Sequence, residues 1–152
     1  MDYEFKSKKL SIYDAFSKIE KLYHKGHLPL IDGIITKEKY IKIDVKYNYG
    51  CKGEITSFIE EEHFDNISLL EKSCSSIGGH TMEYENFIIN YGEGSWGGDG
   101  YIVIMNKAKN VLWIMFHSFI NPIEIIEIEE NKIIGINNCH SKFEFKINWK
   151  EI

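Results

Sequence analysis

The sequence predicts an α+β domain in which an N-terminal helix packs on one face of a mostly antiparallel β-sheet, a meander of about six strands. Three observations lead to this prediction. Apolar residues recur at helical spacing in one clear segment, period-two alternation dominates the C-terminal half, and the connections there are two to five residues long. Parallel strands need far longer crossovers, so these strands are expected to be antiparallel. The whole chain, residues 1–152, has the size of one domain.

The helix is predicted over residues 11–25. Ser11 can cap its start, Asp14 follows three residues later as in a capping box, and Gly26 is a natural stop. A stripe of apolar residues at spacings of three and four is expected to face the sheet. The stripe consists of Ile12, Phe16, Ile19, Leu22 and Tyr23.

The middle of the chain predicts one hairpin. Residues 40–48 alternate between apolar and polar side chains, residues 50–53 are typical of a turn, and residues 54–59 are expected to form the returning strand. The acidic run 60–62 is expected to end that strand. Residues 64–73 are ambiguous and could form a short helix capped by Asp65 or Asn66.

The C-terminal half predicts a series of strands after a loop at residues 75–79. The last strand alternates cleanly between apolar and polar residues, which indicates one buried face and one solvent face. The connecting segments are rich in turn-forming residues. The predicted strands are residues 82–91, 101–106, 111–117, 123–129, 132–137 and 142–149.

The charge composition argues against nucleic-acid binding. The net charge is −5, and all 18 basic residues are lysine, so the chain contains no arginine. Arginine is the preferred side chain for binding phosphates and guanine edges, and its absence removes the usual readers of nucleic acid.

The predictions about compartment and cofactors depend on sequence features that are missing. The first ten residues are charged and lack the apolar segment of a signal peptide. The longest apolar stretch, residues 111–116, is far shorter than the roughly 20 residues of a membrane span. Cys51, Cys74 and Cys139 are odd in number and widely spaced, which argues against a disulfide framework or a structural zinc site. We expect a cytoplasmic protein with reduced thiols, no metal, no cofactor and no membrane association.

Residues 92–100 contain five glycines and match the pattern G-x-G-x-x-G at Gly92, Gly94 and Gly97. A dinucleotide site needs a helix after such a pattern, whereas residues 101–105 strongly favour a strand, so nucleotide binding is not predicted. Two interpretations remain. The segment is either a wide β-loop with Trp96 folded over the core, or a rigid exposed loop. In the second case it would present Glu93, Trp96 and Asp99 to a partner.

Two acidic clusters are candidate docking patches. One is the run Glu60, Glu61 and Glu62, and the other is formed by Glu124, Glu127, Glu129 and Glu130. Such clusters often belong only to a solvated face. The alternative is a patch that attracts a basic partner, because complementary charge speeds encounter and sets specificity.

The histidines do not form a recognisable catalytic or metal-binding motif. Two alternatives to a docking protein nevertheless stay open. His80, Asp99 and His117 could converge as the acid/base site of a small hydrolase. The chain could also be a non-catalytic ligand-binding module, which would show a concave apolar pocket.

Three segments carry a family resemblance: the glycine-rich run 92–102, the strand Leu112-Trp113-Ile114-Met115-Phe116, and the turn Asn121-Pro122-Ile123. Together they resemble bacterial immunity proteins of polymorphic-toxin and contact-dependent inhibition systems. The resemblance covers less than half of the chain, roughly residues 91–149. It implies a cytosolic antitoxin that binds one cognate toxin domain, and it carries over no catalytic residues.

The predicted function is therefore neutralisation of a bacterial toxin domain, for example a nuclease, by steric and electrostatic occlusion. The chain is not expected to be an enzyme. The partner is expected to be a basic protein, and the oligomeric state is left open. The predicted contact residues are Glu93, Trp96, Asp99, Glu60, Glu61 and Glu62.

Overall fold

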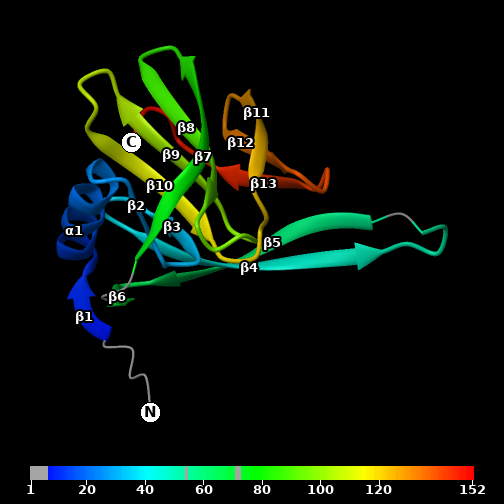
Figure 1. Cartoon of the computed structure of the whole chain (residues 1–152), viewed down its shortest axis with the longest axis horizontal. Helices are drawn as coiled ribbons and strands as arrows, with labels where there is room; N and C mark the ends of the chain where they lie inside the picture. The colour runs from blue at the N-terminus through cyan, green and yellow to red at the C-terminus, as the bar shows by residue number, and fades with distance from the viewer. Residues whose placement is uncertain (1–6, 54, 71–72) are drawn as a thin grey trace.

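A computed structural model describes residues 7–53, 55–70 and 73–152 (Figure 1). Residues 1–6, Glu54 of the predicted strand 54–59, and residues 71–72 of the ambiguous segment lie outside the described residues, as does the side chain of Cys74. Within the described ranges the elements, in chain order, are β1 (Ser7–Ser11), α1 (Ile12–His24), β2 (His27–Pro29), β3 (Gly33–Ile35), β4 (Tyr40–Tyr49), β5 (Ile55–Phe64), β6 (Asn66–Leu70), β7 (Ser73–Tyr84), β8 (Phe87–Gly94), β9 (Gly100–Asn106), β10 (Val111–His117), β11 (Ile123–Glu129), β12 (Lys132–Asn137) and β13 (Lys142–Lys146).

The α+β class and the antiparallel pairing are confirmed. Eight strands of the described chain form the main sheet in the order β2-β7-β8-β9-β10-β3-β4-β5, and neighbouring strands in it pair antiparallel. The prediction of about six strands in one meander is wrong. The main sheet is larger, β11-β12-β13 form a separate sheet, and β1 and β6 form a two-stranded ribbon.

The predicted helix is confirmed as α1, with its expected cap. The Ser11 hydroxyl accepts a hydrogen bond from the Asp14 backbone N–H at 3.2 Å, and Gly26 follows with a φ of +85°. Ala15, Phe16 and Ile19 are completely or almost completely buried. The apolar stripe of the helix therefore faces the core as its spacing predicts.

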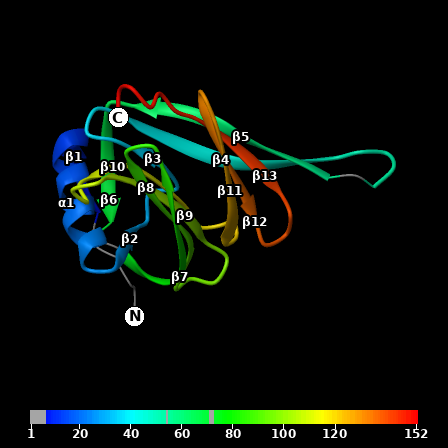
Figure 2. The same ribbon diagram turned by 90° about the horizontal axis from the view of Figure 1, so that it is seen from above.

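The molecule has three layers, which Figure 2 shows side by side. One core lies between α1, the β1–β6 ribbon and one face of the main sheet, and it includes Phe16, Val103 and Phe116. The second core lies between the opposite face and the three-stranded sheet, and it includes Trp113 and Phe145. β9 and β10 are buried on both faces, which explains their continuous apolar sequences.

Several local predictions between residues 60 and 91 are wrong. β5 does not end at the acidic run but continues to Phe64, because its residues keep pairing with β4. Residues 66–70 form a strand, not a helix, because Ile67 and Leu69 alternate into the first core while the segment pairs with β1. Residues 75–79 belong to β7, and the predicted strand 82–91 contains a tight turn at Glu85, whose φ is +51°.

The β4–β5 hairpin projects well beyond the rest of the main sheet (Figure 1). β3 has only three residues and β10 ends at His117, whereas β4 continues to Tyr49 and β5 returns from Ile55. The sheet therefore narrows abruptly beyond the ends of β3 and β10, and this step is where the candidate site lies.

Two further findings concern the compartment predictions. Across the residues that the structure describes, no helix is long and apolar enough to cross a membrane. Cys51 and Cys139 are free, exposed thiols.

Candidate functional site: an acidic hollow beside two aromatic loops

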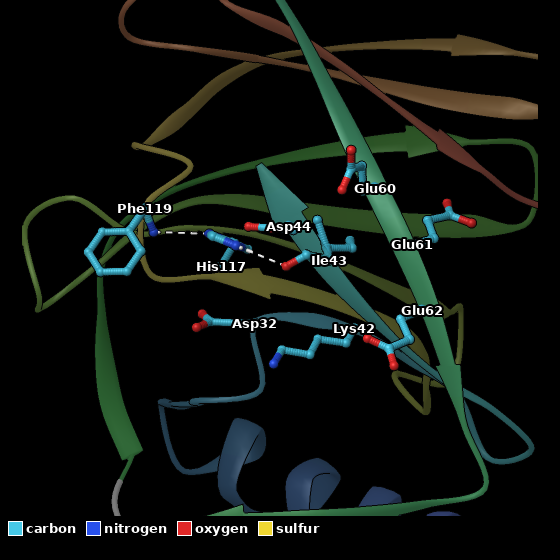
Figure 3. A pocket seen from close by; sticks show the side chains of 9 residues that line it. All are labelled: Asp32, Lys42, Ile43, Asp44, Glu60, Glu61, Glu62, His117 and Phe119. Carbon is cyan, nitrogen blue, oxygen red and sulfur yellow. Dashed lines mark hydrogen bonds between the residues drawn. The ribbon is translucent and has the colours of Figure 1, made fainter. Parts of the chain in front are cut away.

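An open hollow of about 520 Å³ lies at the step where β10 and β3 stop and the β4–β5 hairpin continues (Figure 3). Its walls come from segments that are far apart in the sequence: the residue before β3, the middle of β4, the middle of β5, and the end of β10 with the loop that follows. The lining residues are Asp32, Lys42, Ile43, Asp44, Glu60, Glu61, Glu62, His117 and Phe119.

Asp32 joins the chain entering β3 to the loop that leaves β10. Its backbone is left-handed, with a φ of +43°, and its carbonyl accepts the Ile43 N–H at 2.9 Å. Its carboxylate oxygen Oδ1 accepts both the N–H of Ser118 at 2.7 Å and the hydroxyl of Ser118 at 2.6 Å. Hydrogen bonds to a carboxylate are among the stronger ones in proteins, so this pair anchors the start of the loop.

His117 forms a neutral wall of the hollow. Its Nε2–H donates to the Ile43 carbonyl at 3.2 Å, and its Nδ1 accepts the Phe119 N–H at 3.1 Å, a tautomer assigned from these two partners. The side chain is only 5% exposed. Burial lowers the pKa of His117, and the opposing influences of Asp32, the Ile43 carbonyl and Asp44 are smaller. His117 therefore holds the loop and is already engaged at both ring nitrogens.

The acidic side of the hollow comes from the β4–β5 ladder. Glu60 lies opposite Asp44 and Glu62 lies opposite Lys42 in the register. Figure 3 shows the Glu60 and Glu62 carboxylates on the side of β5 that faces β4, and Glu61 turned to the other side. Glu61 also borders a neighbouring hollow that contains Lys132, Glu144 and Lys146.

The hollow carries a strong negative bias. Five of its nine lining residues have carboxylates, and one, Lys42, is basic. Lys46 lies just outside and pairs with Asp44 at 3.1 Å, and this hydrogen bond raises the pKa of Lys46. Among the described residues, no group of His, Cys, Asp and Glu side chains is arranged to hold a metal ion. A cavity of this size and charge suits the cationic end of a lysine or arginine side chain.

Two aromatic side chains lie on the loops next to the hollow. Phe119 is 75% exposed and also lines the hollow, and Trp96 is 49% exposed. Their loops touch, because the Gly98 carbonyl accepts the Asn121 N–H at 2.8 Å. Gly100 lies so close to the Asn121 carbonyl that an added Cβ would come within 2.3 Å of its oxygen. The glycine-rich segment thus allows the two loops to pack backbone against backbone.

The structure separates the predicted contact residues into different environments. Glu60, Glu61 and Glu62 border the hollow, and Trp96 lies on the adjoining loop. Glu93 is half-buried near the end of β8.

Asp99 needs a correction, because it is fully buried and was expected on an exposed loop. Its carboxylate accepts the Gly94 N–H at 3.2 Å, so it stabilises the glycine-rich loop from within. It does not face solvent. A carboxylate in such a loop satisfies backbone N–H groups that cannot join a ladder.

The proposed hydrolase residues are not brought together. His80 is exposed on β7 and stacks against Tyr91 on β8, with ring centroids 5.2 Å apart. His117 ends β10, two strands beyond β8, and strands are spaced by about 4.8 Å. Asp99 is buried within its own loop.

A second hollow, of about 430 Å³, lies between the β3–β4 turn and the last residues of the chain. Leu112, Trp113 and Ile147 contribute apolar surface to it, but five of its eleven lining residues are charged. Trp113 is almost completely buried and offers little ring surface. This hollow is therefore not the concave apolar pocket expected of a ligand-binding module.

The second acidic cluster lies on β11 and the turn after it, in the three-stranded sheet. Glu124 and Glu127 are exposed, and Glu129 pairs with Lys132 at 3.4 Å. None of these residues lines the 520 Å³ hollow. This cluster is therefore a matched control for the charge of the hollow.

Sequence patterns did not point to Asp32, Asp44 or Phe119 as site residues. Asp32 and Phe119 lie outside the strands, in segments without periodicity, and Asp44 belongs to the ordinary polar face of β4. Only the pairing of β3, β4, β5 and β10 brings them together.

The chain matches no protein-family model, no curated protein and no solved structure in comparisons with known proteins. The charge, shape and exposure of the hollow and its two loops are therefore the observations that bear on function.

Proposed function

We propose that this chain is an immunity-type protein that binds a basic toxin domain in the cytoplasm and neutralises it by covering its surface, without catalysing a reaction. The observation that carries this proposal is the acidic hollow. Carboxylates from three separate segments, at Asp32, Asp44 and Glu60 to Glu62, converge on one open cavity that contains one lysine.

The physical basis of binding is complementary charge. A negative, open surface attracts a positively charged partner before contact and orients it during encounter. If the toxin is a nuclease, the carboxylates occupy the place that substrate phosphates take on its basic surface. When this chain occupies that surface, the toxin's substrate is excluded. Inhibition therefore requires only that the chain binds tightly and covers the substrate-binding surface of the toxin.

The position of the resembling segments supports the same proposal. The glycine-rich loop and the Asn121-Pro122 turn are two of the three segments that resemble immunity proteins, and they contact each other beside the hollow. A surface built from such loops can vary in shape while the layered core stays unchanged.

Co-expression tests the proposal directly. The partner to use is the C-terminal domain of a toxin encoded next to this gene, expressed with and without this chain. We expect cells to survive only with the chain present, and the two proteins to purify as a tight complex without turnover. Unchanged killing by every neighbouring toxin domain would contradict the proposal.

Charge variants test the role of the hollow. The double variant Glu60→Gln/Glu62→Gln should lower the association rate by roughly tenfold at low salt, because it removes two negative charges from the steering surface. The control Glu124→Gln/Glu127→Gln removes the same charge from exposed positions on β11 and should have little effect. Equal association rates for both variants would show that the hollow does not steer the partner.

A further inference from the structure

We infer that Phe119 and Trp96 form the apolar anchor of the interface, and that the partner presents an apolar depression next to a lysine or arginine side chain that enters the acidic hollow. This inference deepens the proposed function and rests on it. It assigns a role to Phe119, which no sequence pattern singled out, and it specifies the chemistry of the surface that the partner must offer.

Both aromatic side chains are exposed. Single apolar residues at a protein surface are common and need no explanation. Here, however, two large aromatic residues lie on loops that contact each other. Phe119 is 75% exposed and Trp96 is 49% exposed. Aromatic residues are enriched in the centres of interfaces, where they contribute more binding energy than their neighbours.

The loop holding Phe119 is fixed by hydrogen bonds within this chain before any partner binds. Ser118 donates two hydrogen bonds to Asp32, the Phe119 N–H donates to His117, and the Asn121 N–H donates to Gly98. Four hydrogen bonds from Ser118, Phe119 and Asn121 therefore hold this loop, although the Phe119 ring itself is largely exposed. A side chain presented from a rigid loop loses less conformational entropy on binding, which favours an anchor.

The Trp96 loop is held in a similar way. The Ser95 N–H donates to the Ser75 carbonyl at 2.8 Å, and the Ser75 N–H donates to the Ser95 hydroxyl at 3.0 Å. Asp99, which follows Trp96 in the chain, is buried, and its carboxylate accepts the N–H of Gly94, which precedes Trp96. The turn that carries Trp96 is therefore attached to β7 through Ser95 and closed across its ends by Asp99.

The exposed Phe119 side chain is continuous with the charged hollow, and this determines the partner's chemistry. Phe119 is itself one of the lining residues, so apolar and acidic surfaces share one wall. The side chains opposite include Glu60 and Glu62, whose carboxylates favour a cationic group at that position, while Asp44 is paired with Lys46. A second copy of this chain has the same net charge of −5 and is repelled overall, whereas a basic protein domain with an adjacent apolar depression is attracted.

Single variants test the anchor with the toxin domain that the wild-type chain neutralises. Phe119→Ala and Trp96→Ala should each weaken the complex by roughly tenfold or more, mainly through faster dissociation, because they remove buried apolar contact. Phe119→Leu should lie between Phe119→Ala and wild type. Tyr49→Ala and Tyr13→Ala remove equally exposed aromatic rings far from the hollow, at 75% and 63% exposure, and should bind within about twofold of wild type.

The outcomes separate this inference from the proposed function. Neutralisation and unchanged affinity in both Phe119→Ala and Trp96→Ala would overturn the anchor and leave the immunity function intact. Failure of the wild-type chain to neutralise any neighbouring toxin domain would overturn both. Circular dichroism and thermal unfolding of each variant show whether a loss of binding comes from a loss of fold.

Discussion

At the scale of single residues, part of the wall of the hollow consists of side chains that already make hydrogen bonds within the chain. Asp32 and His117 border the cavity, yet each uses hydrogen bonds to hold the Ser118–Phe119 loop. Their roles are thus to position Phe119 and to shape the wall. The carboxylates of Glu60 and Glu62, by contrast, are exposed and can meet a partner.

His117 should make folding stability depend on pH. Burial lowers its pKa below the ordinary value of 6.5. As the pH falls, His117 therefore takes up a proton at a higher pH in the unfolded chain than in the folded chain. The stability from neutral His117 is fully present above pH 6.5 and is lost as the pH falls from 6.5 through the lower folded pKa. His117→Gln, which cannot titrate, should lose this component of the pH dependence. Denaturant unfolding across that range measures it, and identical slopes for both proteins would contradict the prediction.

Tyr40 should show the opposite dependence at high pH. Burial raises its pKa to about 12, and the negative charge of Asp32 adds to the effect. Its hydroxyl donates to the Ile31 carbonyl, so ionisation also removes that hydrogen bond. The stability that depends on neutral Tyr40 is present below pH 10 and is lost as the pH rises toward 12. In a titration followed by phenolate absorbance, wild type and Tyr40→Phe should differ only near pH 12, where Tyr40 ionises. A difference near pH 10 would contradict this prediction.

At the scale of elements, the contact between the two aromatic loops depends on Gly100. An alanine Cβ there would lie 2.3 Å from the Asn121 carbonyl oxygen and 2.8 Å from a methyl carbon of Ile120. Because the nearest atom belongs to the backbone, the loops must separate to admit it.

Gly100→Ala should therefore destabilise the fold by about 1–3 kcal/mol. Gly98→Ala is the matched control, since its Cβ would meet the Ser118 carbonyl at an ordinary 3.6 Å. Denaturant unfolding of the two variants compares them. Similar stability in both would show that the loops do not pack as closely as described.

Elements with a strong local signal could be predicted from sequence, and elements defined by distant partners could not. α1 carries its own cap and stripe, and β10, β11 and β12 have the predicted bounds. β6 was missed because a five-residue segment becomes a strand only when β1 lies beside it. The candidate site could not be predicted for the same reason. Glu60 can be recognised in the sequence as part of an acidic run, but its position beside Asp32 and Phe119 depends on the order of strands in the sheet.

At the scale of the whole molecule, β9 and β10 connect the two cores. Alternate residues of these strands point to α1 on one side and to the three-stranded sheet on the other. A signal for this arrangement was present in the sequence, because residues 101–105 and 111–116 are continuously apolar, which is typical of strands buried on both faces. In a meander with one face in solvent, such strands would expose half of their apolar side chains to water.

The shared strands predict one cooperative unfolding transition. Phe16→Ala and Phe145→Ala remove buried rings from opposite sides of the main sheet, and each should cost about 3–5 kcal/mol. Because β9 and β10 belong to both cores, each variant should shift the same single transition. Far-UV circular dichroism and tryptophan fluorescence should give coincident curves, and two separate steps would show that the layers fold independently.

The acidic run on β5 has one more consequence. β5 is the last strand in the order of the main sheet, and β13 lies beside only part of it, where the Ser57 hydroxyl donates to the Lys142 carbonyl. An outermost strand offers backbone groups onto which another molecule can add a strand. Three adjacent negative charges at such an edge repel the same run on a neighbouring copy. The feature that attracts a basic partner thus also opposes edge-to-edge self-association, and neutral substitutions at Glu60 to Glu62 should make concentrated solutions more prone to aggregate.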